Sequence, residues 1–211
     1  MINFVLNKFK KGDNMLTVLT IDKYESFLRQ VSKEVDFNDP DLSKNIDDII
    51  EWSMENNKNY AMAAIQFGIN KRIVYIKSTT PNDPTPNSQT LMINPEIISK
   101  EGRTEFWEAC VSGLNNLGLV ERPYKIVVRY YDKSGNVHIQ EFEGFSATVV
   151  SHELDHLDGI FHMDRAKRVV QLLPEEREEF RKNNQYNIIS KTGQFEYDKP
   201  NKKAIYKNLS K

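Results

Sequence analysis

Two histidines one helical turn apart are the residues of this chain with the clearest chemical potential. Residues 152–156 have the sequence His-Glu-Leu-Asp-His. Side chains four positions apart lie on the same face of a helix, so His152 and His156 could hold one divalent transition metal. Glu153 projects from the same face and can act as a general base toward a water on that metal. The spacing predicts a metal-dependent hydrolase.

The residues around this motif predict a helix without help from the histidines. Gly144 favours a turn, and Ser146 can cap the helix that follows it. Gly159 then supplies a stop signal. Apolar residues recur at the helical period beside the metal-binding face: Ala147, Val150, Leu154 and Leu157. We expect a core helix that also forms the floor of a cleft. The alternative, a half-buried helix with two satisfied histidines, gives Glu153 no role.

Two histidines need at least one further ligand, and the sequence offers two candidates. Cys110 is the only cysteine; a lone cysteine is more often an inert apolar residue, but a thiolate is a strong ligand for Zn or Fe(II). His162 is the other candidate, because residues 152–162 also fit the metzincin protease pattern H-E-x-x-H-x-x-G-x-x-H. Metzincins need a methionine turn well beyond the third histidine. The only methionine after residue 156 is Met163, directly adjacent to His162.

Length and composition limit the classes of protein to consider. The chain has 211 residues, a formal net charge of −1 and 28% charged residues, which predicts one domain and no nucleic-acid-binding surface. No apolar run approaches the length of a membrane span. A single cysteine excludes an internal disulfide and fits a reducing compartment. The apolar part of residues 1–15 is short for a signal peptide, so we expect a cytoplasmic protein. This extension leaves an organellar location open, and also whether Met1 or Met15 is the true start.

The coarse layout is α+β. Periodicity predicts a helix at 42–56 and a second helix at 174–183. The second is charged, and we expect it to face solvent. Strands are expected at 72–77, 91–98, 125–132 and 137–142, the last two joined by a hairpin turn at Lys133-Ser134-Gly135-Asn136. A proline-containing loop is expected at 79–90. The lysine-rich residues from 184 onward show little periodicity, and we expect them to pack loosely.

The chain resembles the peptide deformylase family. The three family motifs, G-x-G-x-A-A-x-Q, E-G-C-x-S and H-E-x-D-H, correspond in order to residues 59–66 (Asn-Tyr-Ala-Met-Ala-Ala-Ile-Gln), 108–112 (Glu-Ala-Cys-Val-Ser) and 152–156. Three weaker stretches also fit: Leu28-Arg29, Ile93-Asn94-Pro95-Glu96 and Met163-Asp164. The resemblance implies antiparallel β-sheets around a central metal-binding helix. It divides the chain into an N-terminal extension (1–15), a catalytic domain (16–170) and a C-terminal helix with a loosely packed tail (171–211).

The resemblance also implies a reaction, removal of the N-formyl group from the first methionine of new polypeptides. Cys110, His152 and His156 would hold one divalent metal, Fe(II) in the native protein and replaceable by Zn or Ni. Glu153 would be the base. The partner implied is a formylated peptide, with transient contact to the ribosome and none to nucleic acid or membrane.

Further roles follow from the same resemblance. The Gln66 side chain and the backbone N–H of Val111 would form an oxyanion hole. Backbone groups near Tyr60, Ala61 and Ala109 would bind the peptide as an added strand. Val149 would line the pocket for the methionine side chain.

The chain departs from the family pattern where substrate would lie. Asn59, Ala61 and Ala109 replace glycines, which permit positive φ or a close approach of backbone. We therefore expect strain in these loops and a groove narrowed by a methyl group at two points. Two alternatives follow: an active enzyme with altered or weaker substrate preference, or a binding module descended from a deformylase.

Overall fold

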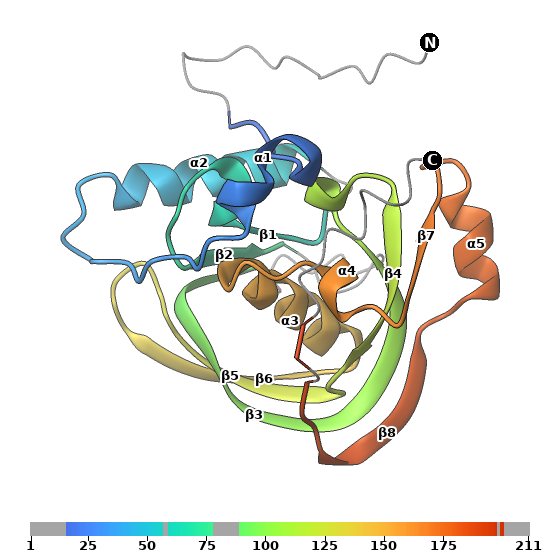
Figure 1. Cartoon of the computed structure of the whole chain (residues 1–211). Helices are drawn as coiled ribbons and strands as arrows, with labels where there is room; N and C mark the ends of the chain where they lie inside the picture. The colour runs from blue at the N-terminus through green and yellow to red at the C-terminus, as the bar shows by residue number, and fades with distance from the viewer. Residues whose placement is uncertain (1–15, 57–58, 78–88, 198, 201–211) are drawn as a thin grey trace.

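The computed structural model describes residues 16–56, 59–77, 89–197 and 199–200 (Figure 1). Its helices are α1 (Ile21–Leu28), α2 (Leu42–Glu55), η1 (Ala64–Phe67), η3 (Val111–Gly113), α3 (Phe145–Leu157), α4 (His162–Arg165) and α5 (Arg177–Asn183). Its strands are β1 (Ala61–Ala63), β2 (Ile73–Ile76), β3 (Thr90–Ala109), β4 (Asn116–Arg122), β5 (Lys125–Tyr131), β6 (Val137–Glu143), β7 (Arg168–Gln171) and β8 (Asn187–Gln194). The predicted extension 1–15 and nearly all of the loop at 79–90 lie outside the described residues.

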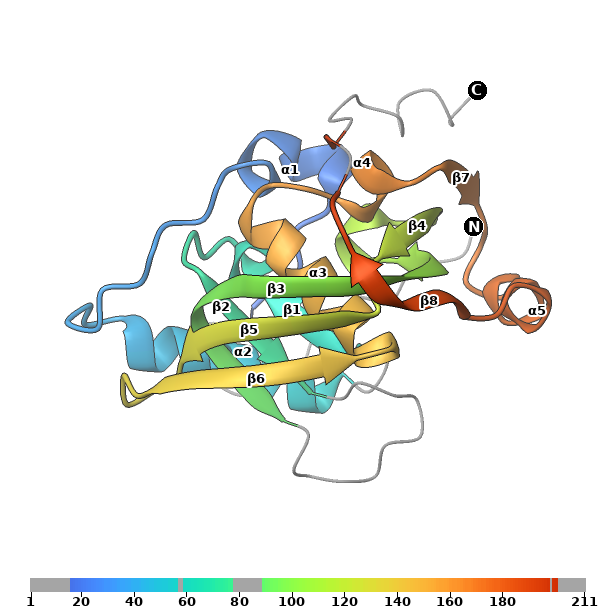
Figure 2. The same cartoon turned by 90° about the horizontal axis from the view of Figure 1, so that it is seen from below.

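The long strand β3 organises the sheet. It is 20 residues long and pairs antiparallel with β2, β5, β8 and β4 along successive parts of its length. Register shifts between Ile93 and Ser99 mark irregularities in its pairing with β5, and irregularities of this kind bend a strand. The sheet consequently curves around α3, as both views show (Figures 1 and 2). The sequence predicted only 91–98 of this strand, because the charged residues after position 98 hide its alternation.

Helix α3 lies inside this curved sheet and is almost entirely buried. The predicted apolar stripe is confirmed, since its four residues are each no more than 5% exposed: Ala147, Val150, Leu154 and Leu157. They pack in one cluster with residues of β1, β2, β5 and β6. A second cluster joins α2 to the other face of β1 and β2. The metal-binding motif therefore sits on the most firmly packed helix of the fold.

The N-terminal end of α3 differs from the prediction, and its C-terminal end agrees with it. Gly144, with φ +61°, is the residue before the helix, and no side chain caps it. Ser146 lies in the first turn and its Oγ donates to the carbonyl of Glu143 at 2.7 Å, so the predicted Ser146 cap is wrong. At the other end Gly159 adopts φ +66°, as expected of a glycine that follows a helix.

The C-terminal segment packs more closely than predicted. β8 pairs with the second half of β3, Phe195 is 5% exposed, and the Tyr197 ring lies 3.8 Å from the guanidinium carbon of Arg165. The prediction of loose packing is therefore wrong for the aromatic residues of this segment, whose contacts no local period indicates, whereas Ile188 and Ile189 of β8 remain exposed. The predicted domain boundary at 170/171 also falls inside β7, which pairs with β4.

The predicted helix α5 is present but shorter than expected, since it begins at Arg177 and not at residue 174. No residue of it is buried, yet it is not simply solvent-facing, since Phe180 packs edge-on against Trp107 of β3 with ring centroids 5.0 Å apart. Within the described ranges, no helix combines the length and apolar character of a membrane span.

The helix end at Gly159 yields a stability prediction. A Cβ at this position would lie 2.2 Å from the carbonyl oxygen of Arg29, and its φ of +66° costs an L-residue about 1–2 kcal/mol. Gly159→Ala should therefore lower the thermal midpoint by more than about 5 °C, at roughly 2–4 °C per kcal/mol for this size. Gly193→Ala is the control, because Gly193 has φ +98° with no atom within 4 Å of the added carbon. An equal decrease of the thermal midpoint in the two variants, measured by calorimetry, would contradict the close contact between Gly159 and the Arg29 backbone.

Candidate active site

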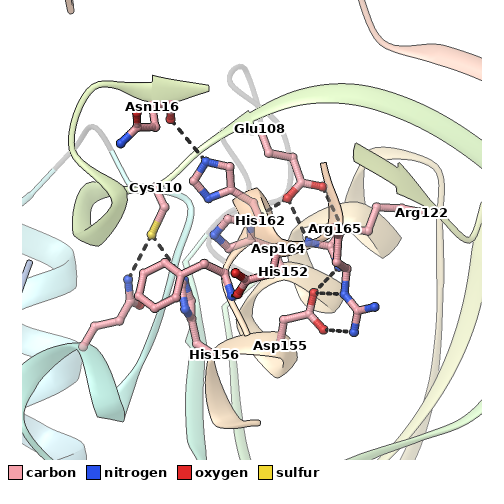
Figure 3. Close-up of polar contacts among 12 residues, drawn as sticks. Glu108, Cys110, Asn116, Arg122, His152, Asp155, His156, His162, Asp164 and Arg165 are labelled. Atoms are coloured by element: carbon pink, nitrogen blue, oxygen red, sulfur yellow. Dashed lines mark hydrogen bonds and ion pairs between the residues drawn. The ribbon is translucent and has the colours of Figure 1, made fainter. Parts of the chain in front are cut away.

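The three predicted metal ligands meet in space. Cys110 follows β3 and precedes η3, while His152 and His156 lie on α3. One ligand atom of each lies within 4.8 Å of the others, and the Cys110 Sγ is 3.2 Å from the Nε2 of His156 (Figure 3). All three residues are buried. Within the described ranges, this is the only such cluster of histidine, cysteine or carboxylate side chains.

A buried chain of charges orients His152. The Nδ1 of His152 is 2.7 Å from the Oε2 of Glu108, which directs the other ring nitrogen toward Cys110 and His156, as is usual for a metal-binding histidine. Arg122 donates two hydrogen bonds to Glu108, at 2.7 and 2.9 Å. Arg122 also pairs with Asp155, which accepts two further bonds from Arg165 at 2.7 Å each (Figure 3). The motif positions Glu108 and Asp155 therefore belong to one ionic network behind the ligands.

This network sets the protonation of its members. Burial alone would raise the pKa of Glu108, but the charge and hydrogen bonds of Arg122 hold it well below its usual range. Glu108 is thus a permanent anion that accepts from His152. Burial and the neighbouring His152 together lower the pKa of His156 well below its usual value. A cysteine sulfur that binds as the thiolate and two imidazoles that bind in the neutral form are donors that a divalent transition metal accepts, so the residues present fit a metal ion.

Glu153 faces the same space from α3. It lines the cavity beside the ligands and is 6% exposed. Its Oε2 has no hydrogen-bond partner among the described residues, and burial raises its pKa to about 7. A carboxyl group with a pKa near neutrality can both accept and return a proton.

Gln66 lies on η1, and its side chain contacts the Cys110 thiol. Its Oε1 accepts from the backbone N–H of Ala63 at 2.9 Å. Its Nε2 donates to the Oγ of Ser112 at 3.1 Å and lies 3.4 Å from the Sγ of Cys110. Val111, the first residue of η3, lines the same cavity and is 41% exposed. The predicted oxyanion-hole residues therefore border the space in front of the ligands.

Two of the predicted ligands, Cys110 and His152, line a cavity of about 500 Å³ together with Glu153. Four residues predicted from the sequence to contact substrate line it: Tyr60, Ala61, Ala109 and Val149. The sequence did not predict the other side chains that complete the wall: Phe106, Phe145, Thr148, Arg177, Arg181 and Tyr186. Phe145 forms edge-on ring contacts with Phe106 and with Tyr60, and both phenylalanine rings also contact Tyr186. These residues lie outside the motifs, and only the fold brings them together.

Comparison with known proteins identifies the family. A family model described as polypeptide deformylase matches residues 15–171. The chain belongs to the peptide deformylase family. The peptide deformylase of Rhizobium meliloti is 36% identical over 138 residues, 65% of this chain and 78% of the relative. That of Caldicellulosiruptor bescii is 38% identical over 146 residues, 69% of this chain and 83% of the relative.

Solved deformylase structures have the same fold. The crystal structure from Thermotoga maritima matches with a TM-score of 0.63 and 30% identity, covering 74% of this chain and all of that one, 100%. A class I type b deformylase from Acinetobacter baumannii, solved with Met-Ala-Ser bound, matches with a TM-score of 0.63 and 30% identity over 72% of this chain and 98% of that one. The α+β fold inferred from the resemblance is confirmed.

Membership of the deformylase family excludes the metzincin interpretation, and His162 shows why. Its Nε2 lies 3.2 Å from the carbonyl oxygen of Asn116, and its ring stacks on His152 with centroids 5.6 Å apart. Cβ atoms built on Gly113 and Gly118 would lie 2.9 and 3.1 Å from the His162 ring. His162 is therefore a buried neighbour that fills space between two glycines, and it is not part of the ligand group.

The substituted glycines of the deformylase motifs carry no backbone strain. Among the described residues, the only non-glycine residues with positive φ are Asn94 and Leu114, so Asn59, Ala61 and Ala109 adopt ordinary conformations. The prediction of backbone strain in these loops is therefore wrong. The methyl groups of Ala61 and Ala109 do border the cavity, so a narrowed groove remains a prediction.

The ligand geometry yields a prediction about metal content. Cys110→Ala should lose stoichiometric metal, because two imidazoles alone bind a divalent ion far more weakly than a three-ligand site. His162→Ala should keep it. Elemental analysis of gel-filtered protein measures both, with circular dichroism to establish that each variant is folded. Retention in the cysteine variant together with loss in the histidine variant would reverse the assignment of the third ligand.

Proposed function

We propose that this chain is an amide hydrolase that removes the formyl group from the N-terminal methionine of new polypeptides. The observation that carries the proposal is the convergence of Cys110, His152 and His156 beside a cavity lined by Glu153, whose Oε2 has no hydrogen-bond partner among the described residues. The relatives of this chain are peptide deformylases, which supports the choice of reaction. The proposed setting is the cytoplasm, with transient contact to the ribosome that makes the substrate.

The metal site is assigned to Cys110, His152 and His156. A divalent ion held there would polarise the formyl carbonyl and make a bound water acidic enough to attack near neutral pH. We propose Fe(II) as the native ion, with Zn or Ni as replacements, since thiolate and imidazole donors accept all three. Elemental analysis of anaerobically purified protein tests this choice, and stoichiometric zinc without iron would overturn it.

Glu153 is assigned the proton transfers. Its carboxylate takes a proton from the attacking water and returns it to the departing amine, which would otherwise leave poorly. The pKa of about 7 caused by burial suits a group that must do both. Glu108 cannot take this role, because its carboxylate is already engaged by Arg122 and His152.

Gln66 and Val111 are assigned to the oxyanion hole. The Gln66 amide is held in place by Ala63 and Ser112, and its contact with the Cys110 sulfur can be exchanged for a hydrogen bond to the developing oxyanion. The backbone N–H of Val111 would be the second donor. Each such donor typically lowers a barrier by about 2.7–4 kcal/mol.

The substrate backbone is assigned to the edge of the sheet. β1 stands at the end of the strand order, with β2 as its neighbour, so a peptide can add to it as a further strand beside Tyr60 and Ala61. Ala109 would bind it from the other side. The methionine side chain would then lie against Val149 and the aromatic wall.

The decisive experiment measures formate release. The chain should release formate from formyl-Met peptides and leave acetyl-Met and unblocked peptides largely intact, because the methyl groups of Ala61 and Ala109 favour the smallest acyl group. Ala61→Gly and Ala109→Gly should keep their metal and raise kcat/KM on formyl peptides.

The matched control for this experiment is Glu153→Gln. It should retain metal, since Glu153 is given no ligand role, and lose roughly 10²–10⁴-fold in kcat. If neither the parent nor the glycine variants release formate with metal fully bound, the binding-module alternative replaces the enzyme.

A further inference from the structure

Helix α5 brings two arginines to the wall of the cavity. Arg177 and Arg181 both line it, together with Cys110, His152 and Glu153. The stretch matched by the family model ends at residue 171, before α5 begins. The resemblance to deformylases therefore assigns these two side chains no role.

Neither guanidinium is neutralised by a carboxylate. Among the described residues, neither Arg177 nor Arg181 forms a salt bridge, whereas Lys182 on the same helix pairs with Glu178. The Nε atoms of both arginines are buried without a hydrogen-bond partner in the described part of the chain. Burial and the nearby positive charge of Arg181 both lower the pKa of Arg177.

The acidic groups of the cavity cannot supply the missing partner. Glu108 is bound to Arg122 and His152. Glu153 lines the same cavity but forms no ion pair with either arginine among the described residues. A cavity with two guanidinium groups that pair with no carboxylate favours a ligand that carries a negatively charged group.

The two arginines differ in the contacts that their guanidinium groups already make within the protein. Arg177 donates to the carbonyl of Leu114 at 2.9 Å and to the Oδ1 of Asn115 at 3.2 Å, so it also holds the loop after η3. Arg181 has its guanidinium 5.9 Å from the Phe106 ring centre. Burial raises the pKa of the Tyr60 phenol and the charge of Arg181 acts against that rise. Arg181 therefore lies within electrostatic reach of the edge where the peptide strand is proposed to add.

We propose that Arg181, assisted by Arg177, is an anion-binding subsite that selects formylated peptides with an acidic side chain within three residues after the formyl-methionine. This inference rests on the proposed function. A carboxylate at that distance along an added strand would exchange the unpaired guanidinium groups for charge-assisted hydrogen bonds, which are stronger than neutral ones.

The test compares formyl-Met peptides that carry glutamate or its uncharged isostere glutamine at position two, three or four. All peptides are C-terminal amides, so the only carboxylate is the one under test. The metal-loaded protein should favour glutamate over glutamine at one of these positions by roughly tenfold in kcat/KM, as expected for a hydrogen-bonded charge pair. Raising the salt concentration should shrink this ratio, because partly exposed charges are screened.

Variants assign the preference to a residue. Arg181→Gln should reduce the glutamate-to-glutamine ratio to about one, and Arg181→Lys should keep part of it, since the charge remains and the bidentate geometry is lost. Lys182→Gln is the matched control, because Lys182 neighbours Arg181 in sequence but pairs with Glu178 and does not line the cavity. It should leave the ratio unchanged. A ratio that survives in Arg181→Gln would overturn the proposal.

A binding measurement separates this inference from the proposed function. Dissociation constants of the unformylated product peptides, with glutamate or glutamine, require no turnover. Tighter binding of the glutamate peptide that depends on Arg181 supports the subsite even if no formate is released. Equal dissociation constants, together with equal kcat/KM values for all formyl peptides, would reject the subsite and leave the deformylase activity standing.

Discussion

The buried guanidinium of Arg122 is the group on which the rest of the site depends. It is 0% exposed and joins Glu108 at the end of β3 to Asp155 on α3. Three elements are thereby held in one orientation, and Glu108 in turn fixes the ring of His152. Removing one partner of a buried ion pair typically costs about 3–5 kcal/mol, because the other charge is left without compensation. Arg122 therefore links the stability of the fold to the geometry of the ligands.

The curvature of the sheet provides the second constraint. Because β3 is long and bent, its two ends reach opposite sides of α3, and Cys110 arrives beside His156 directly after the strand ends. The thiol and the imidazoles belong to segments more than 40 residues apart, so their geometry is only as stable as the packing of α3 inside the sheet. The apolar stripe of α3 supplies that packing through β1, β2, β5 and β6, and the adjacent face of the helix carries the histidines and Glu153.

The C-terminal segment extends the catalytic domain. β8 pairs with β3, Tyr197 packs on Arg165 of the ionic network, and α5 forms part of the cavity wall. A segment that supports the network and also borders the cavity can adjust substrate preference without altering the metal ligands. The methyl groups of Ala61 and Ala109 border the same cavity.

The sequence by itself predicted the histidine pair, Glu153 as the base and the core helix, because all three follow from local spacing, whereas Cys110 as the third ligand followed from the family motifs. His152, Glu153 and His156 share a helical face, and the apolar stripe of α3 follows the same 3.6-residue period. It also predicted the β5–β6 hairpin from its turn residues, and the presence of both Gln66 and Cys110 at the site from the family motifs. Only the tertiary structure revealed Arg122, the arginines of α5, and the contacts that hold His162 as a buried neighbour of the site. Their roles depend on contacts between segments distant in the chain, and no local period or motif records which distant side chains will share one buried charge.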